Sequence, residues 1–129
     1  MDDLTAEWIK FSDTDLKTAK YLYDNMRPSP MEIICYHCQQ SAEKALKGVL
    51  INKEITPPKT HDLEKLFAIC KEYIPNINAV WRACNILNQY GIQPKYPEEI
   101  EITEEDVQEA LTCAKDILKF LKPLFPQNK

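Results

Sequence analysis

The chain has 129 residues, the size of one domain that builds a single core without disulfides or metal. Its formal net charge of −4 argues against a domain that is basic throughout, as many nucleic-acid-binding domains are, but not against a local basic patch. No run of about 18 apolar residues occurs, and the acidic start is unlike a signal peptide. We therefore expect one cytoplasmic domain over residues 1–129, with no membrane span.

Composition and patterning predict an all-α fold. The chain has only two glycines, and Leu, Lys, Glu and Ala, which favour helices, are common. The first helix is predicted over residues 4–25, and two prolines in the stretch 27–30 should end it. Its expected inward face has apolar side chains at every three to five positions: Leu4, Trp8, Phe11, Leu16, Ala19 and Leu22.

A second helix is predicted to follow and to end near residue 52. Ser29 is its expected N-cap, with Pro30 at the first helical position. Four small residues should let a neighbouring helix approach closely: Ser41, Ala42, Ala45 and Gly48.

Three further helices complete an up-and-down bundle of about five helices. Gly91 suits the C-terminal cap of the fourth, and Thr103 should cap the fifth, where acidic residues favour the positive end of the helix dipole. The helices are predicted to begin at residues 60–62, 79 and 103, with a break over 73–78, an ordered loop over 91–102 and a stop at Pro123.

The five cysteines are odd in number and scattered. Cys35 and Cys38 form a C-x-x-C pair, which could serve metal binding or redox chemistry, but no second ligand pair follows at the spacing of a zinc finger. We therefore predict no metal site and interpret the cysteines as small, reduced, buried hydrophobic residues.

Helix two carries the most distinctive polar residues. At about 100° per residue, Gln40, Lys44 and Lys47 form one stripe with His37 beside it. Two ammonium groups and an amide could hold a phosphate, although a solvated helix face would have the same spacing. Gln39 and Glu43 lie nearer the apolar edge and should hydrogen-bond a neighbouring helix or loop.

Two other segments offer candidate ligand contacts. His61 either caps and packs the third helix or acts as a base or nucleotide contact, in which case Asp62 is the alternative cap. Lys95 either meets phosphate or lies in water, and Tyr96 either stacks on a base or covers the core edge.

Known catalytic patterns are missing from the sequence. It has no phosphate-binding glycine loop, no G-x-S-x-G and no His pair at metal-binding spacing. The dense carboxylates over residues 98–105 are typical of a solvated face, with a carboxylate metal site as the alternative. We predict neither catalytic residues nor a cofactor.

Three blocks in this order resemble the HEPN domain family (higher eukaryotes and prokaryotes nucleotide-binding). Residues 36–47 are similar to its Q-x-x-E-K-A-L-K helix, residues 60–63 to its T-H-D-L helix start and residues 95–97 to its R-Y-P loop, with Lys95 in place of the arginine. The resemblance implies a five-helix bundle, commonly a homodimer, often paired with a small nucleotidyltransferase in a toxin–antitoxin-like module. On the three blocks we expect a nucleotide site made of Gln40, Lys44, Lys47, His61, Lys95 and Tyr96.

Many HEPN relatives are metal-independent RNases with an arginine followed, after four to six residues, by a histidine. Arg27 and Arg82 are the only arginines here. The positions that would carry the histidine are Glu32, Ile33 and Ile34, or Leu87, Asn88 and Gln89. We therefore favour a module that binds a nucleotide, RNA or a nucleotidyltransferase partner over an RNase or nucleotide-processing enzyme with a non-standard site.

A homodimer is also expected from the supply of aromatic residues, which are enriched at interfaces. The alternative is that these rings fill the monomer core or its rim. The residues in question are Trp8, Tyr21, Tyr23, Trp81, Tyr90 and Phe125.

Overall fold

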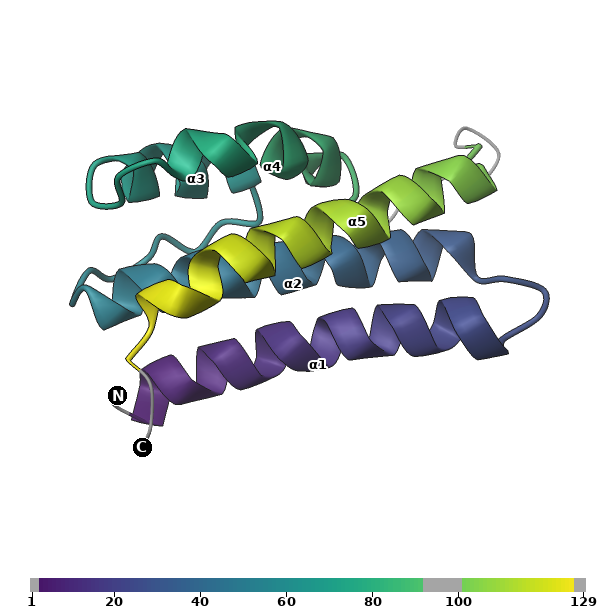
Figure 1. The fold of residues 1–129 in the computed structure, drawn as a ribbon, viewed down its shortest axis with the longest axis horizontal. Helices are drawn as coiled ribbons and strands as arrows, with labels where there is room; N and C mark the ends of the chain where they lie inside the picture. Colours follow the sequence, from purple (N-terminus) through teal and green to yellow (C-terminus); the bar gives the residue numbers. More distant parts are fainter. Residues whose placement is uncertain (1–2, 92–100, 127–129) are drawn as a thin grey trace.

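A computed structural model of the chain describes residues 3–91 and 101–126. It confirms the all-α, up-and-down bundle, and these two stretches contain five α-helices and no strand (Figure 1). The α-helices are α1 (Asp3–Asn25), α2 (Met31–Asn52), α3 (Leu63–Lys71), α4 (Trp81–Asn88) and α5 (Glu104–Leu121), with short 3-10 helices η1 (Ile77–Val80) and η3 (Lys122–Leu124). None of the helices in these two stretches is long and apolar enough to cross a membrane.

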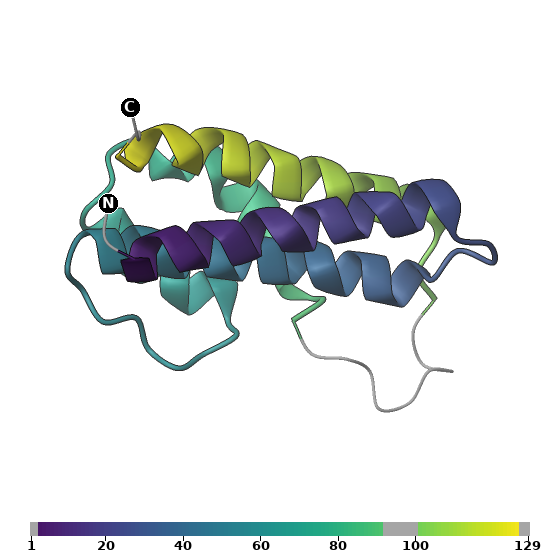
Figure 2. The ribbon, with the colours of Figure 1, turned by 90° about the horizontal axis from the view of Figure 1, so that it is seen from below.

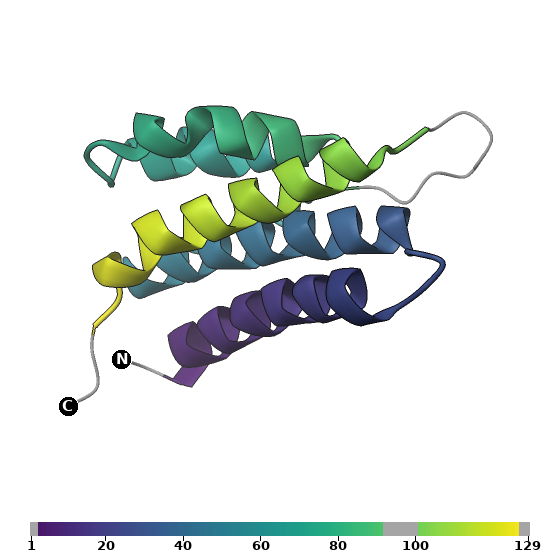
Figure 3. The ribbon, with the colours of Figure 1, turned by 45° about the vertical axis from the view of Figure 1, so that its right-hand side comes forward.

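Helix α2 lies at the centre of the bundle. Helix α1 runs along one side of it, α5 crosses another side, and α3 and α4 form a further layer (Figures 1 and 3). Every residue from 38 to 50 except Lys44 is consequently buried. Because this helix also carries polar and charged residues, the fold must supply partners for them inside the bundle.

Helices α1 and α2 approach closely, as the small residues predict. A Cβ atom on Gly48 would lie 3.1 Å from the Cβ of Trp8. One turn further along, Ser12 Oγ donates to the Ser41 carbonyl at 2.7 Å, and Ser41 Oγ donates to the Ser12 carbonyl at 2.9 Å. A larger side chain at these positions would separate the two backbones and break this reciprocal pair.

The predicted inward face of α1 is partly wrong. Leu4 and Phe11 are each 50% exposed, whereas Ser12 and Asp15 are buried. The physical reason is that α1 packs against a side of α2 that carries serine, lysine and histidine, so its own polar side chains turn inward to pair with them. The larger apolar side chains are thereby displaced to the rim.

Two of the predicted helix ends are also wrong. Pro30, not Ser29, occupies the N-cap of α2, and no side chain caps that helix. Helix α4 ends at Asn88 with Gln89 at the cap position, so Gly91 lies two residues beyond the cap and has no positive φ. Thr103 caps α5 as predicted, within a capping box that includes Asp106.

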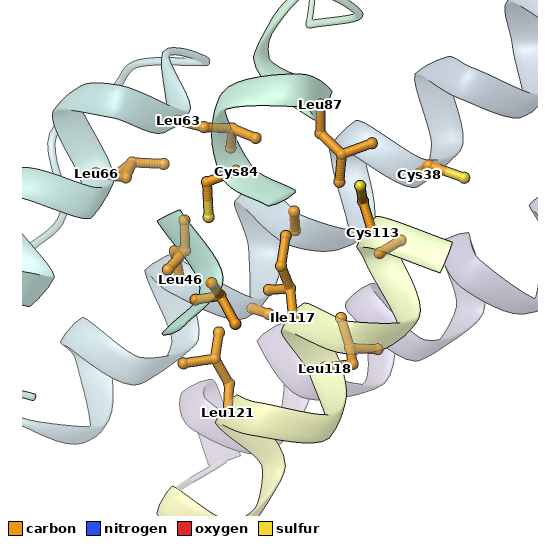
Figure 4. Packing of buried hydrophobic residues seen from close by; sticks show 14 of the residues in the cluster. Cys38, Leu46, Leu63, Leu66, Cys84, Leu87, Cys113, Ile117, Leu118 and Leu121 are labelled. Carbon is orange, nitrogen blue, oxygen red and sulfur yellow. The ribbon is translucent and has the colours of Figure 1, made fainter. Parts of the chain in front are cut away.

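The hydrophobic core lies between α2, α3, α4 and α5 (Figure 4). Leucine and isoleucine side chains from these four helices fill it, and Cys38, Cys84 and Cys113 lie among them. All five cysteines are buried and free, which confirms the prediction that they act as small hydrophobic residues. Among the described residues no group of His, Cys, Asp or Glu side chains is arranged to hold a metal ion.

The buried thiols should make the fold sensitive to alkali. Burial raises the pKa of Cys70 and Cys84 from 9.0 to about 12, and that of Cys113 to about 11. The folded chain therefore keeps neutral thiols at a pH where the unfolded chain ionises them. The free energy of unfolding should be little affected well below pH 9 and should fall above it, until about pH 12 for Cys70 and Cys84 and about pH 11 for Cys113, by up to about 1.4 kcal/mol per pH unit for each thiol.

Urea titrations at pH 8, 9 and 10 measure this loss. Lysine and tyrosine side chains titrate in the same range, so a Cys70→Ala/Cys84→Ala variant is the control and should lose less stability per pH unit than the natural chain. Identical slopes in the two proteins would contradict the prediction.

Candidate functional site

The polar residues of α2 gather around two acidic side chains, one on α2 itself and one on α1. Glu43 is the centre of the larger group, and its side chain is only 4% exposed. We call this group the Glu43 cluster, and its members are Gln39, Gln40, Glu43, Lys47 and His61.

Two cationic or titratable groups contact the Glu43 carboxylate. Lys47 Nζ lies 3.0 Å from Glu43 Oε2, one helical turn away on the same helix. His61 Nδ1 lies 3.1 Å from Oε1 and 3.2 Å from Oε2. The Lys47 side chain is 10% exposed, whereas the His61 side chain is 69% exposed, so the cluster reaches the surface at the imidazole.

Two glutamine amides complete the cluster. Gln39 Nε2 donates to the backbone carbonyl of His61 at 3.0 Å and to Glu43 Oε1 at 3.3 Å. Gln40 Nε2 donates to Gln39 Oε1 at 2.8 Å and lies 3.4 Å from Glu43 Oε1. These bonds confirm that Gln39 and Glu43 hydrogen-bond a neighbouring segment, which is the connector just before α3.

The position of His61 is fixed by the start of α3. Asp62 is the N-cap, and its Oδ1 accepts from the Glu64 backbone N–H at 2.9 Å. Asn88 on α4 accepts from the Leu63 backbone N–H at 2.7 Å and donates to Asp62 Oδ1 at 3.0 Å. His61 is therefore not the cap of this helix, and its ring remains available to Glu43 and to the surface.

A second group lies between α1 and α2. Asp15 Oδ1 is 2.9 Å from His37 Nδ1, and Asp15 Oδ2 is 2.6 Å from Lys44 Nζ. Lys44 Nζ also lies 6.0 Å from the centre of the Phe11 ring, as Lys47 Nζ lies 5.8 Å from that of Trp8. Such cation–π contacts keep the lysine stems against the aromatic edge of α1.

The family is decided by comparison with known proteins, because a model of the HEPN domain matches residues 5–124. The chain belongs to the HEPN domain family. "Putative toxin MJ1304" from Methanocaldococcus jannaschii is 30% identical over 94% of this chain and 88% of its own length.

Two solved structures share the HEPN fold with this chain. The crystal structure of TT1696 from Thermus thermophilus has a TM-score of 0.81 at 23% identity, covering 96% of this chain and all of that one. The crystal structure of ST0689, an archaeal HEPN homologue, has a TM-score of 0.73 at 26% identity, covering 93% of this chain and 96% of that one.

The structure brings together three of the six residues expected to form a nucleotide site. Gln40, Lys47 and His61 meet at Glu43, while Lys44 belongs to the neighbouring Asp15 group. The other two, Lys95 and Tyr96, lie outside the described residues.

Two observations refine the picture of this surface. Gly91, the last described residue before 92–100, lies against the cluster, since a Cβ atom there would be 3.0 Å from Gln39 Nε2 and 3.3 Å from the His61 carbonyl. Gln40 and Lys47 are 9% and 8% exposed, so the interpretation of the stripe as a solvated helix face is wrong for these two.

The sequence pointed to Glu43 as a hydrogen-bonding group but not as the centre of a cluster, and it did not point to Asp15. Glu43 stands four residues before Lys47, a spacing that favours an ion pair on one helix, so that signal was present in the sequence. Asp15 carried no such signal, because its partners lie on a different helix.

The arrangement around His61 suits proton transfer or anion binding. A carboxylate on Nδ1 fixes the orientation and tautomer of an imidazole and leaves Nε2 to act on a ligand. Each lysine ammonium has three N–H donors, so Lys44 and Lys47 keep donors beyond those used on Asp15 and Glu43. The surface thus combines an oriented imidazole, that of His61, with two lysine ammonium groups that have N–H donors to spare.

Removing one member of the buried Glu43–Lys47 ion pair should cost more stability than removing both. Glu43→Ala leaves the Lys47 ammonium buried and unpaired, and we expect the free energy of unfolding to fall by roughly 3 kcal/mol. Glu43→Leu/Lys47→Met removes both charges and should recover most of this loss. Urea denaturation at pH 7 measures both variants.

Asp13→Ala is the matched control, because it breaks the more exposed ion pair between Asp13 and Lys122 at 2.6 Å. Its cost should stay below about 1 kcal/mol. A Glu43→Ala variant no less stable than this control would show that Lys47 does not depend on the carboxylate.

Proposed function

We propose that this chain is the cytoplasmic HEPN component of a toxin–antitoxin-like pair. In this proposal it works with a small nucleotidyltransferase and binds a nucleotide or RNA at the Glu43 cluster. The observation that carries the ligand part is the His61 imidazole, which is held by a buried carboxylate and is 69% exposed. The relative named as a toxin supports the module, as it shares 30% identity across most of both chains.

Charge and position favour an anionic ligand at this surface. With a neutral imidazole, the Glu43 and Lys47 charges cancel, and a proton on His61 makes the cluster positive. Lys44 lies at the adjacent edge with a side chain that is 27% exposed, where its remaining donors can reach a phosphate. Lys95 and Tyr96, which lie outside the described residues, belong to the proposed site on the family-like sequence block at 95–97 alone.

The homodimer is part of this proposal. Several large apolar side chains remain at the surface of the single chain, among them Phe11 at 50%, Tyr21 at 66% and Trp81 at 41% exposed. A second copy would cover such rings, and two-fold pairs are the commonest closed assembly. The partner surface for a nucleotidyltransferase would then be a separate face.

Calorimetric titration with ATP tests the ligand site. We expect Lys44→Gln/His61→Gln to bind at least about tenfold more weakly than the natural chain, because two charge-assisted contacts to phosphate are lost. Lys20→Gln is the control, because Lys20 is an exposed lysine on α1 outside the site, and this variant should bind ATP like the natural chain. Equal affinity in all three proteins would remove the site, and no binding of ATP, of other nucleotides or of RNA by the natural chain would leave only the protein-partner function.

The second candidate is a metal-independent RNase, and the contact between His61 and Glu43 favours it. An oriented histidine can take the proton from a ribose hydroxyl. The arginines give no support: Arg27 is bound to the Tyr23 and Met26 carbonyls at the end of α1, and Arg82 lies on α4. The RNase pattern of many relatives needs an arginine followed after four to six residues by a histidine, and neither Arg27 nor Arg82 is followed by one at that spacing.

We therefore expect no cleavage of a labelled single-stranded RNA in the absence of metal. The measurement compares the natural chain with His61→Ala on a denaturing gel. Cleavage that persists in His61→Ala would indicate a contaminating nuclease. Cleavage that vanishes in this variant would establish the enzyme and displace the binding proposal.

A further inference from the structure

An open groove of about 540 Å³ lies between α4 and α5. Figure 2 shows α5 and the connector that carries His61 on opposite sides of α2. Among the described residues, none of those that line the groove belongs to the Glu43 cluster. What it can bind follows from its two walls.

One wall is mostly apolar and includes two alanines. Ala79, Ala83 and Ile86 line it at spacings of four and three residues, which places them along one face of η1 and α4. Val80 and Cys113 lie deeper and are almost fully buried. The small side chains at this wall leave room for another backbone to approach.

The other wall is acidic. Glu105, Glu109, Thr112 and Asp116 line it at positions i, i+4, i+7 and i+11, so they form one straight stripe along about 16 Å of α5. Arg82 on α4 is the only cation among the residues that line the groove. Three carboxylates against one guanidinium make the groove negative.

None of these charged side chains takes part in an ion pair with another described residue. Within residues 3–91 and 101–126, the ion pairs closer than 4.0 Å involve none of Arg82, Glu105, Glu109 and Asp116. The charges of the Glu43 cluster contrast with this, since they pair with one another. Like charges four residues apart on a helix repel one another, so the stripe has a cost that a cationic partner would relieve.

We propose that this groove docks an amphipathic helix of a partner protein. The small apolar wall takes the apolar face of that helix, and its Lys or Arg side chains, spaced at four and seven residues, pair with Glu105, Glu109 and Asp116. This is the helix-in-groove mode of recognition, with charge complementarity selecting the partner. A polyamine would satisfy the carboxylates but leave Ala83 and Ile86 uncovered. The inference stands apart from the Glu43 cluster, and either can fail without the other.

A charge-swap experiment tests the proposal with defined probes. The probes are two fluorescein-labelled 18-residue helical peptides with the same Leu and Ala face, one carrying Lys at i, i+4, i+7 and i+11 and the other Glu. Fluorescence anisotropy should show that the natural chain binds the Lys peptide at least about tenfold more tightly than the Glu peptide. Glu109→Lys/Asp116→Lys should reverse this preference.

Glu7→Lys/Glu72→Lys is the matched control, because it makes the same change in net charge at exposed sites outside the groove. It should keep the preference for the Lys peptide. Circular dichroism confirms that each variant folds, and Glu105→Lys serves as a second groove variant if the first does not.

Several outcomes would overturn the proposal. They are binding of neither peptide at millimolar concentration, an unchanged preference in a folded groove variant, and the same loss in groove and control variants. Displacement of the Lys peptide by equimolar spermine would indicate a polyamine site instead. Sedimentation velocity without peptide measures the oligomeric state of each protein. A dimer that dissociates only in the groove variant would show that the groove binds a second copy of this chain and not a partner helix.

Discussion

The fold depends on partners for the charged side chains of the buried helix α2. Helix α2 is surrounded by α1, α5 and the layer of α3 and α4, yet it holds the Glu43 carboxylate almost out of contact with water. An isolated charge in such a place would be prohibitive, so the carboxylate must be paired and hydrogen-bonded. Lys47, His61 and the two glutamines meet that demand, and in doing so they attach the connector before α3 to α2.

Buried ion pairs of this kind add little net stability, because the desolvation of both charges offsets their attraction. Their effect is to specify one arrangement. Asp15 matches α1 to α2 only where it meets both His37 and Lys44, and Glu43 matches the α3 start to α2 only where it meets His61. A slip of either segment would leave a charge unpaired, so the polar groups select the register while the leucines supply the burial.

The helices could be predicted from the sequence because their signals are local. Prolines, the Thr103 capping box and the apolar spacing all act within a few residues, and the bundle follows from them. The inward face of α1 could not be predicted, since whether Ser12 and Asp15 or Leu4 and Phe11 turn inward depends on which side of α2 receives the helix. The same limit applies to the site. The sequence identified the motif residues, but it could not show that Lys44 pairs with Asp15 whereas Lys47 pairs with Glu43.

The two faces of the molecule therefore differ in how their charges are held. At the Glu43 cluster the charges are buried and mutually satisfied, so a ligand gains access only through the exposed imidazole and the spare donors of the lysines. In the α4 and α5 groove the carboxylates lie at an open surface and form no ion pair with other residues that the structure describes, so a cationic surface can meet them directly. In the function that we propose, desolvation would favour a ligand group that fits the held imidazole at the first site, whereas the second would suit a large partner whose charges are spaced along a helix. The two binding activities that we propose, of a nucleotide and of another protein, would need these two kinds of surface, and α2 and α5 carry them on different parts of one bundle.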